Sequence, residues 1–225
     1  MFDGVVVKAA VIGGTGDMGF GLAVRLAHAG VEVVIGSRKV ERAIEAAEKI
    51  KAIVKHGNVS GKINPESVKN CDFVFFSIPY EGLREIAQSV AEFIEKNSVV
   101  VSCVVPFVEN KSSAAEELAE LLPAGTRLVS ALHTVSASLL TDLDKPVDSD
   151  TFLFGDDKEA KKQVAKLLSK IAGLRPVDGG PLKNSKYGEL FTRFLVGINK
   201  RYGVSSAGIR ITWLDDSTVY RRWEA

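Results

Sequence analysis

The stretch Val11-Ile12-Gly13-Gly14-Thr15-Gly16-Asp17-Met18-Gly19 decides the fold of this chain. It follows an apolar run, residues 5–12, and opens a segment with helical periodicity, residues 19–29. The pattern Gly-x-Gly-x-x-Gly between a strand and a helix is typical of dinucleotide-binding turns. We expect Gly14 to permit the tight turn, Gly16 to let backbone approach a pyrophosphate, and Gly19 to let helix and strand pack closely. The amides of Thr15 to Met18 would then face the phosphates, unless this is a plain glycine-rich turn without a ligand.

Apolar runs of strand length alternate with amphipathic segments along most of the chain. The further strand-like runs are residues 32–35, 73–78, 99–105, 127–132 and 151–154. The helical patterns between them are residues 19–29, 40–55, 83–96 and 113–122. Continuous Val, Ile and Phe runs alternating with helices indicate a parallel sheet covered on both faces. The sequence therefore predicts a Rossmann-type, doubly wound α/β fold with a mainly parallel sheet.

The pattern changes near residue 155, so we expect a nucleotide-binding Rossmann domain over residues 1–155 and a small C-terminal α/β extension over 156–225. The extension contains a helical pattern at 158–171, a short strand at 175–177 and a turn at 178–181. A second helix is predicted at 185–202, and its apolar residues need another subunit or the main domain to cover them; they are Leu190, Phe191, Phe194, Leu195 and Ile198. The charged residues 214–225 look like a frayed tail.

Composition excludes several classes of partner. The 225 residues include 29 basic and 28 acidic side chains, and this balance gives no global field for nucleic acid or an anionic membrane. No run approaches the about 18 apolar residues of a membrane span, and Met1–Val7 lack the features of a signal peptide. Cys71 and Cys103 lie in apolar runs and read as buried thiols rather than a disulfide or metal pair. We expect a cytoplasmic protein without a metal site.

The end of the second predicted strand bears on the choice of cofactor. NAD sites place an acidic residue there to bind the ribose 2′-hydroxyl. This strand instead ends in Gly36-Ser37-Arg38-Lys39, and Arg42 follows one helical turn later. These cations and the hydroxyl would hold a 2′-phosphate. The alternative is a solvated basic helix start, which is electrostatically unfavourable at a helix N-terminus. The sequence therefore favours NADP over NAD.

Several motifs together make the match to one family specific. They are residues 13–23, 36–39, Ser77-Ile78-Pro79-Tyr80-Glu81, Ser130-Ala131-Leu132-His133-Thr134 and Gly173-Leu174-Arg175-Pro176, with Gly180-Pro181-Leu182 beyond. Over residues 8–211 the chain resembles the archaeal and actinobacterial NADPH-dependent coenzyme F420 reductases. The resemblance implies hydride transfer between C4 of nicotinamide and C5 of the deazaflavin, with NADP and coenzyme F420 as small-molecule co-substrates. The apolar residues of the helix predicted at 185–202 favour a homodimer joined through it.

The resemblance assigns roles to individual residues. Those matched to the nucleotide are Thr15, Gly16, Asp17, Met18, Ser37, Arg38 and Arg42. Ile78, Val105 and Ala137 match positions near the nicotinamide, where ordinary core packing is the alternative, and Pro79 and Pro106 would shape the floor. Lys186 and Thr192 match positions at the polar tail of the deazaflavin. His133 would orient the stacked rings, without acid or base chemistry, unless it is simply a satisfied, half-buried histidine.

Two other functions are compatible with the nucleotide half of the sequence. The first is an NADPH-dependent reductase of another acceptor, such as a flavin, a ferric complex or an imine. The second is a non-enzymatic NADP(H)-sensing subunit. His133 and the prolines clustered near the expected second ring argue against a sensing subunit, and the family-specific C-terminal segment argues against both.

Overall fold

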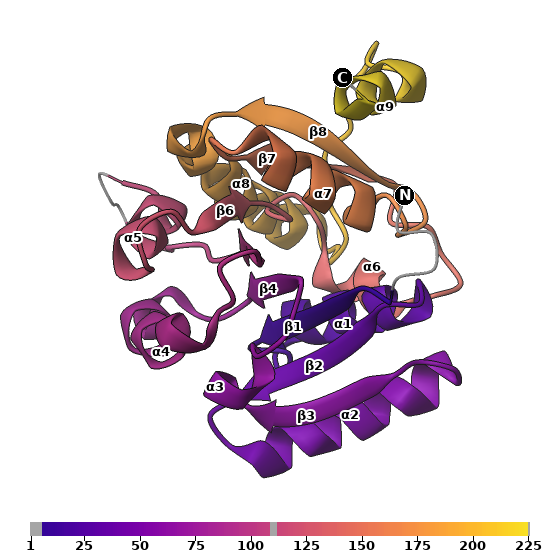
Figure 1. Cartoon of the computed structure of the whole chain (residues 1–225). Coiled ribbons are helices and arrows are strands. Elements are labelled where there is room, and N and C mark those ends of the chain that lie inside the picture. Colours follow the sequence, from indigo (N-terminus) through magenta and orange to yellow (C-terminus); the bar gives the residue numbers. More distant parts are fainter. Residues whose placement is uncertain (1–5, 109–111, 225) are drawn as a thin grey trace.

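The chain folds around one eight-stranded sheet with the strand order β3-β2-β1-β4-β5-β6-β7-β8 (Figure 1). The structure is a computed structural model that describes residues 6–108 and 112–224. The strands are β1 Lys8–Ile12, β2 Glu32–Ser37, β3 Val59–Ile63, β4 Phe73–Phe76, β5 Val99–Ser102, β6 Arg127–Ser130, β7 Ser149–Phe154 and β8 Leu174–Gly180. Strands β1 to β6 are parallel, β7 is antiparallel to β6, and β8 is parallel to β7.

The predicted doubly wound, mainly parallel fold is confirmed. Residue 5, where the first predicted strand begins, lies outside the described residues. The sheet runs on through β8, so the boundary predicted at residue 155 stays a prediction. No helix among the described residues is both long enough and apolar enough to cross a bilayer.

Two hydrophobic cores lie on opposite faces of the sheet, because successive residues of a strand point to opposite sides. In β1, Ala9 and Val11 belong to one core, and Ala10 and Ile12 to the other. The first core is covered by α1 Asp17–His28, α2 Val40–Val54, α6 Ala137–Thr141 and α7 Lys158–Leu168. The second is covered by α4 Leu83–Val90 and α5 Ala114–Leu121. This double cover leaves the carboxyl ends of the strands as the open edge where ligands bind in such folds.

The sequence did not predict β3, which pairs with β2 at one end of the sheet. Of its five residues only Val59 is buried, because β3 is an edge strand. Gly61 lets α2 pack against the strand, since a Cβ atom there would lie 2.3 Å from the carbonyl carbon of Ala43. Strand β3 leads directly into the short helix α3 Asn64–Ser67.

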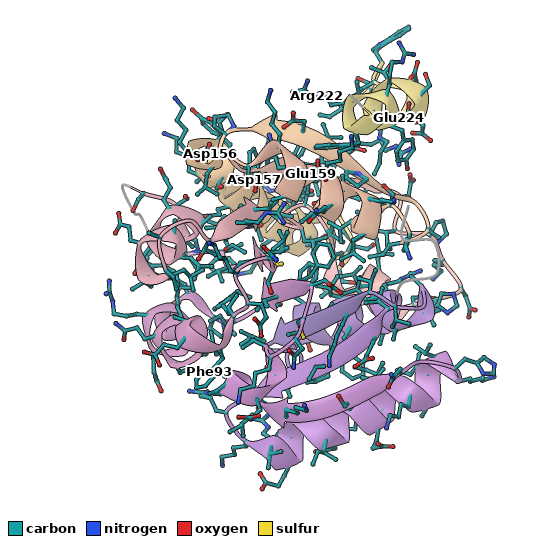
Figure 2. All side chains as sticks on the ribbon, viewed as in Figure 1. Phe93, Asp156, Asp157, Glu159, Arg222 and Glu224 are labelled. Atoms are coloured by element: carbon teal, nitrogen blue, oxygen red, sulfur yellow. The ribbon has the colours of Figure 1, made fainter. Side chains whose placement is uncertain are left out.

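The prediction of a frayed tail is wrong, because residues Asp216–Glu224 form helix α9 against β8. Val219 is buried, the indole nitrogen of Trp223 donates to the carbonyl of Pro176, and Arg222 pairs with Asp178 at 2.8 Å. Figure 2 labels Arg222 on this helix, which stands beyond the edge strand. Tertiary contacts, rather than an apolar face visible in the sequence, hold this segment.

The turn predicted at residues 178–181 is also wrong, because β8 continues to Gly180. Gly179 lies against the ring of Phe154, and a Cβ atom there would be 2.3 Å from Phe154 Cε1. Gly179 is therefore required by close packing within the sheet, whereas Gly180 has a left-handed backbone with φ at 93°. Helix α8, Ser185–Tyr202, follows with the bounds that the sequence predicted.

A buried ion pair ties β7 and β8 to the C-terminal segment. Asp150 is fully buried, and its carboxylate accepts from Arg175 Nε at 2.7 Å and Nη2 at 2.9 Å. The same carboxylate accepts from the backbone of Ile211 at 2.7 Å. Arg175 also donates to the carbonyl of Leu214 and pairs with Asp216. One bidentate pair therefore anchors both the last strand and the chain that leads into α9.

We predict that Asp150→Ala lowers the free energy of unfolding by about 3–5 kcal/mol, because it leaves the Arg175 guanidinium buried without its partner. Urea denaturation checks this. Glu45→Ala, which breaks an exposed pair with Lys49, should cost at most about 1 kcal/mol. Equal effects of the two substitutions would contradict the structural role of the buried pair.

Candidate active site

The turn between β1 and α1 is shaped by glycines in close contact. Gly13 has a left-handed backbone, with φ at 80°. A Cβ atom on Gly13 would lie 2.1 Å from the carbonyl oxygen of Ser77, so the turn touches the chain that leaves β4. On Gly14 it would lie 2.8 Å from Ile35 Cδ1, and on Gly19 it would lie 2.5 Å from the Gly13 carbonyl. These three glycines are therefore required by the protein itself.

Gly16 differs from the other glycines of the turn. A Cβ atom there would meet no protein atom closer than the Gly13 carbonyl at 3.5 Å, which is ordinary contact. Helix α1 begins directly after it at Asp17, and no side chain caps this end. Amides of a first helical turn have no partner within the helix. The open space above Gly16 and these amides fit a phosphate group.

A basic pocket of about 540 Å³ lies beside this turn. It is lined by eight of the predicted site residues, namely Thr15, Gly16, Ser37, Arg38, Lys39, Arg42, Ile78 and Pro79. None of its three cations forms an ion pair with a carboxylate of the residues that the structure describes. The Ser37 hydroxyl accepts a long hydrogen bond from the Lys39 backbone, 3.3 Å, and keeps its proton to donate. The pocket therefore offers uncompensated positive charge to an anionic ligand.

A second cavity of about 570 Å³ continues from the basic pocket. The two share Gly16, Ser77, Ile78 and Pro79 as a common wall. Six further residues of the second cavity were predicted as site residues; they are Asp17, Met18, Val105, His133, Ala137 and Thr192. The carboxyl ends of β1, β2, β4, β5 and β6 thus line one extended cleft.

Four predicted residues lie outside this cleft. Gly14 and Gly19 line neither cavity and act through packing. Pro106 and Lys186 line a separate pocket of about 100 Å³, and the Lys186 ammonium lies 5.4 Å from the centre of the Tyr187 ring. Lys186 and Thr192 therefore do not face the same cavity, and their predicted contact with one ligand tail stays a prediction.

Glu189 is a buried group that the sequence did not single out. Its carboxylate accepts from the backbone of Ala114 at 3.0 Å and of Ala115 at 3.3 Å, so it joins α8 to the start of α5. Burial raises the pKa of Glu189 to about 7, although the two amide hydrogen bonds favour the charged form. No local sequence pattern indicates this contact, because the partners of Glu189 lie 74 and 75 residues away in the chain.

Contacts from several elements fix the position of His133 beneath α8. The preceding residue, Leu132, has a left-handed backbone with φ at 70°, and its amide donates to the Thr151 hydroxyl at 2.8 Å. The Thr192 hydroxyl donates to the His133 carbonyl at 2.5 Å. A Cβ atom on Gly188 would lie 3.2 Å from Nδ1 of the imidazole, so α8 passes directly over the ring. A strained backbone supported from several sides is common where a side chain must be aimed.

The imidazole of His133 is 5% exposed, and neither ring nitrogen has a partner with hydrogen-bond geometry among the described residues. Burial lowers the pKa of His133 to about 4, partly offset by the backbone of Val104. The ring is therefore neutral at neutral pH. A neutral imidazole has one donor and one acceptor nitrogen, and in His133 both are buried at the wall of the second cavity.

Comparisons with known proteins identify the family. The model of the family described as "NADP oxidoreductase coenzyme F420-dependent" matches residues 8–106. The F420-dependent NADP reductase of Methanocaldococcus jannaschii is 40% identical over 225 residues, covering 93% of this chain and 100% of the relative. This chain belongs to the F420-dependent NADP reductase family. A second family member, from Methanothermobacter thermautotrophicus, is 37% identical over 94% of this chain and 97% of its own.

A solved structure supports the fold of this family member. The protein, a candidate F420-dependent NADP reductase from Arthrobacter sp. FB24, superposes with a TM-score of 0.78 at 23% identity, covering 92% of this chain and 99% of its own.

Several residues to which the sequence assigned no role also line the cleft; among them are Asn64, Ser77, Tyr80, Glu81, Cys103, Leu132 and Val135. Four of these residues lie within the family motifs and could have been predicted from them; they are Ser77, Tyr80, Glu81 and Leu132.

Neither cysteine is suited to nucleophilic chemistry. Both are free thiols, and burial raises the pKa of Cys103, in the cleft, to about 12. Burial likewise raises the pKa of Cys71 to about 11. Since the thiolate is the reactive form, both remain protonated near neutral pH. Over residues 6–108 and 112–224, no group of three or more His, Cys, Asp or Glu side chains is arranged to hold a metal ion.

We predict that the buried imidazole makes stability fall in acid. The folded pKa of His133, about 4, lies below the ordinary 6.5, so the unfolded chain binds a proton first as pH falls through this window. At about 1.4 kcal/mol per pKa unit, this lowers the free energy of unfolding by up to roughly 3 kcal/mol between pH 6.5 and 4. His133→Asn should remove this decline, as measured by urea denaturation across pH. The exposed His56→Asn serves as control, and parallel curves for wild type and His133→Asn would contradict the assignment.

Proposed function

We propose that this chain transfers a hydride between NADP(H) and coenzyme F420. The observation that carries the proposal is the extended cleft, which joins a basic pocket at one end to the buried His133 at the other. Its family relatives are named for the same pair of reactants. The basic end suits a phosphorylated nucleotide, and the apolar wall at Ile78, Val105 and Ala137 suits flat rings.

In this proposal the chain binds and aligns both reactants. The first-turn amides of α1 and the space above Gly16 receive the pyrophosphate. Ser37, Arg38 and Arg42 bind the 2′-phosphate, with Lys39 beside them. His133 and Thr192 hold the second ring against the nicotinamide in the neighbouring cavity. The nicotinamide and the deazaflavin supply the hydride chemistry themselves, so the contribution of the protein is proximity, orientation and exclusion of water.

Anaerobic mixing of NADPH with oxidised F420 tests the proposed function, with the visible absorbance of the deazaflavin as readout. Wild type should bleach it with NADPH far more effectively than with NADH. Arg38→Ala should raise the NADPH concentration needed by about one to two decades and leave the NADH requirement nearly unchanged, because only a charge-assisted phosphate contact of about 1.5–3 kcal/mol is lost. Lys96→Ala, which removes an exposed charge before β5, is the matched control.

The other functions correspond to distinct outcomes of this experiment. Oxidation of NADPH only with a flavin, a ferric complex or an imine would replace F420 by that acceptor. NADPH binding without turnover of any acceptor would indicate a sensing subunit. Equal losses for NADPH and NADH in Arg38→Ala would remove Arg38 from the 2′-phosphate site.

We further propose a cytoplasmic homodimer joined through α8. Large apolar side chains on this helix remain open to solvent, with exposed fractions of 52% for Leu190, 39% for Phe191 and 63% for Phe194. Trp213, in the segment that follows, is fully exposed and has a left-handed backbone with φ at 63°. A contiguous apolar face of this kind is typical of an interface rather than a free surface. A second copy of the chain would cover it.

We predict that Phe194→Glu dissociates the dimer, because it places a charge in an apolar interface. Light scattering should report a dimer for wild type and a monomer for the variant at micromolar concentration, a weakening of at least about tenfold. Ile53→Glu replaces an apolar residue of comparable exposure on α2, at the other end of the sheet, and should leave the dimer intact. A monomeric wild type at this concentration would refute the proposed interface.

A further inference from the structure

Asn64 lies at the basic end of the cleft. It is not among the site residues that the sequence predicted. It follows β3 directly, and in the parallel pairing of β3 with β2 the preceding residue, Ile63, is level with Ser37. Asn64 and Arg38 are the residues that directly follow this last level pair on the two chain segments. It lines the same pocket as Ser37, Arg38 and Arg42.

The side-chain amide of Asn64 is buried without a hydrogen-bond partner. The residue is 5% exposed, its Oδ1 has no partner among the described residues, and its Nδ2 donates to none of them. Its backbone carbonyl, by contrast, accepts from the Ser67 hydroxyl at 2.7 Å. Buried polar side chains in folded proteins are nearly always hydrogen-bonded, so an unpaired amide in the wall of a pocket points to a ligand.

The surroundings of Asn64 also determine what position 36 can carry. A Cβ atom on Gly36 would lie 2.6 Å from Ser67 Oγ and 3.0 Å from Asn64 Oδ1. Position 36, directly before the strand end at Ser37, therefore has no room for a side chain. Asn64 fills that space with a neutral amide, which does not repel a phosphate and carries both a donor and an acceptor.

We propose that the Asn64 carboxamide hydrogen-bonds the phosphorylated adenosine ribose of NADP(H) and is a determinant of the preference for NADP over NAD. This inference rests on the proposed function, because it assumes that the basic pocket holds the 2′-phosphate. The amide nitrogen donates to phosphate oxygen beside the Arg38 guanidinium, and the amide oxygen can accept from a ribose hydroxyl. The two ends of an amide have nearly the same shape, so a half-turn of the group presents either one to the ligand.

Calorimetric titration with 2′,5′-ADP and with 5′-ADP tests the inference without F420 or turnover. Asn64→Ala should weaken 2′,5′-ADP binding by about tenfold, because a hydrogen bond to a charged group is lost. Asn64→Asp keeps the shape but places a negative charge beside the phosphate, so the loss should approach about a hundredfold. Binding of 5′-ADP should change by less than about threefold in both variants, a shift within one ordinary hydrogen bond. Asn58→Asp, an exposed residue before β3, is the matched control and should change neither ligand.

Each outcome decides one question. If wild type does not prefer 2′,5′-ADP, the proposed NADP function fails. If wild type prefers it and Asn64→Asp keeps the same ratio of affinities, this inference alone is overturned. Equal losses for both ligands, with a lower melting temperature, would make Asn64 a purely structural residue and would also overturn it. If Asn64→Asp does not fold, the affinity ratio of Asn64→Ala decides in the same way.

Discussion

The cleft depends on the backbone contact between the first glycine turn and the chain leaving β4. No side chain fits between Gly13 and the Ser77 carbonyl, since a Cβ atom would lie 2.1 Å from that oxygen. The contact brings residues 77–79 against the start of α1, and they become the wall that both cavities share. Gly19, packed on Gly13, fixes the direction of α1 in turn. The glycines of this turn therefore hold the first-turn amides of α1 and the shared wall of the two cavities in one rigid arrangement.

The positive charge at the basic end of the cleft is a local feature, because the chain as a whole carries a formal charge of only +1. Arg38 and Lys39 lie just before α2, where the positive end of the helix makes cations unfavourable. No ion pair with a described carboxylate offsets that repulsion. A bound phosphate would relieve it and would satisfy the first-turn amides of α1 nearby. The same region leaves Asn64 without a protein partner, so charge and hydrogen-bonding capacity are both in excess there.

The sequence predicted the features that are encoded locally and missed those that depend on distant contacts. The glycine turn, the basic strand end and the bounds of α8 could be predicted, because their signals lie within about one helical turn or one strand. Strand β3 was missed because, as an edge strand, it buries only Val59. Because β3 was missed, Asn64 was missed too, since it enters the pocket of Ser37 and Arg38 only through the pairing of β3 with β2. Helix α9 was missed because its anchors, Asp178 and Pro176, lie about 40 residues earlier in the chain.

Burial makes the His133 imidazole at the other end of the cleft poorly suited to proton transfer. A general acid or base works best with a pKa near the working pH, whereas burial lowers the pKa of His133 to about 4. The fold instead fixes the position of His133 through three constraints. They are the left-handed backbone of Leu132, the hydrogen bond from the Thr192 hydroxyl and the close approach of Gly188. Two of these three constraints come from α8, whose outer face is apolar and exposed. A second copy of the chain covering that face would stiffen the helix that aims His133, so the proposed dimer and the proposed ring alignment depend on the same element.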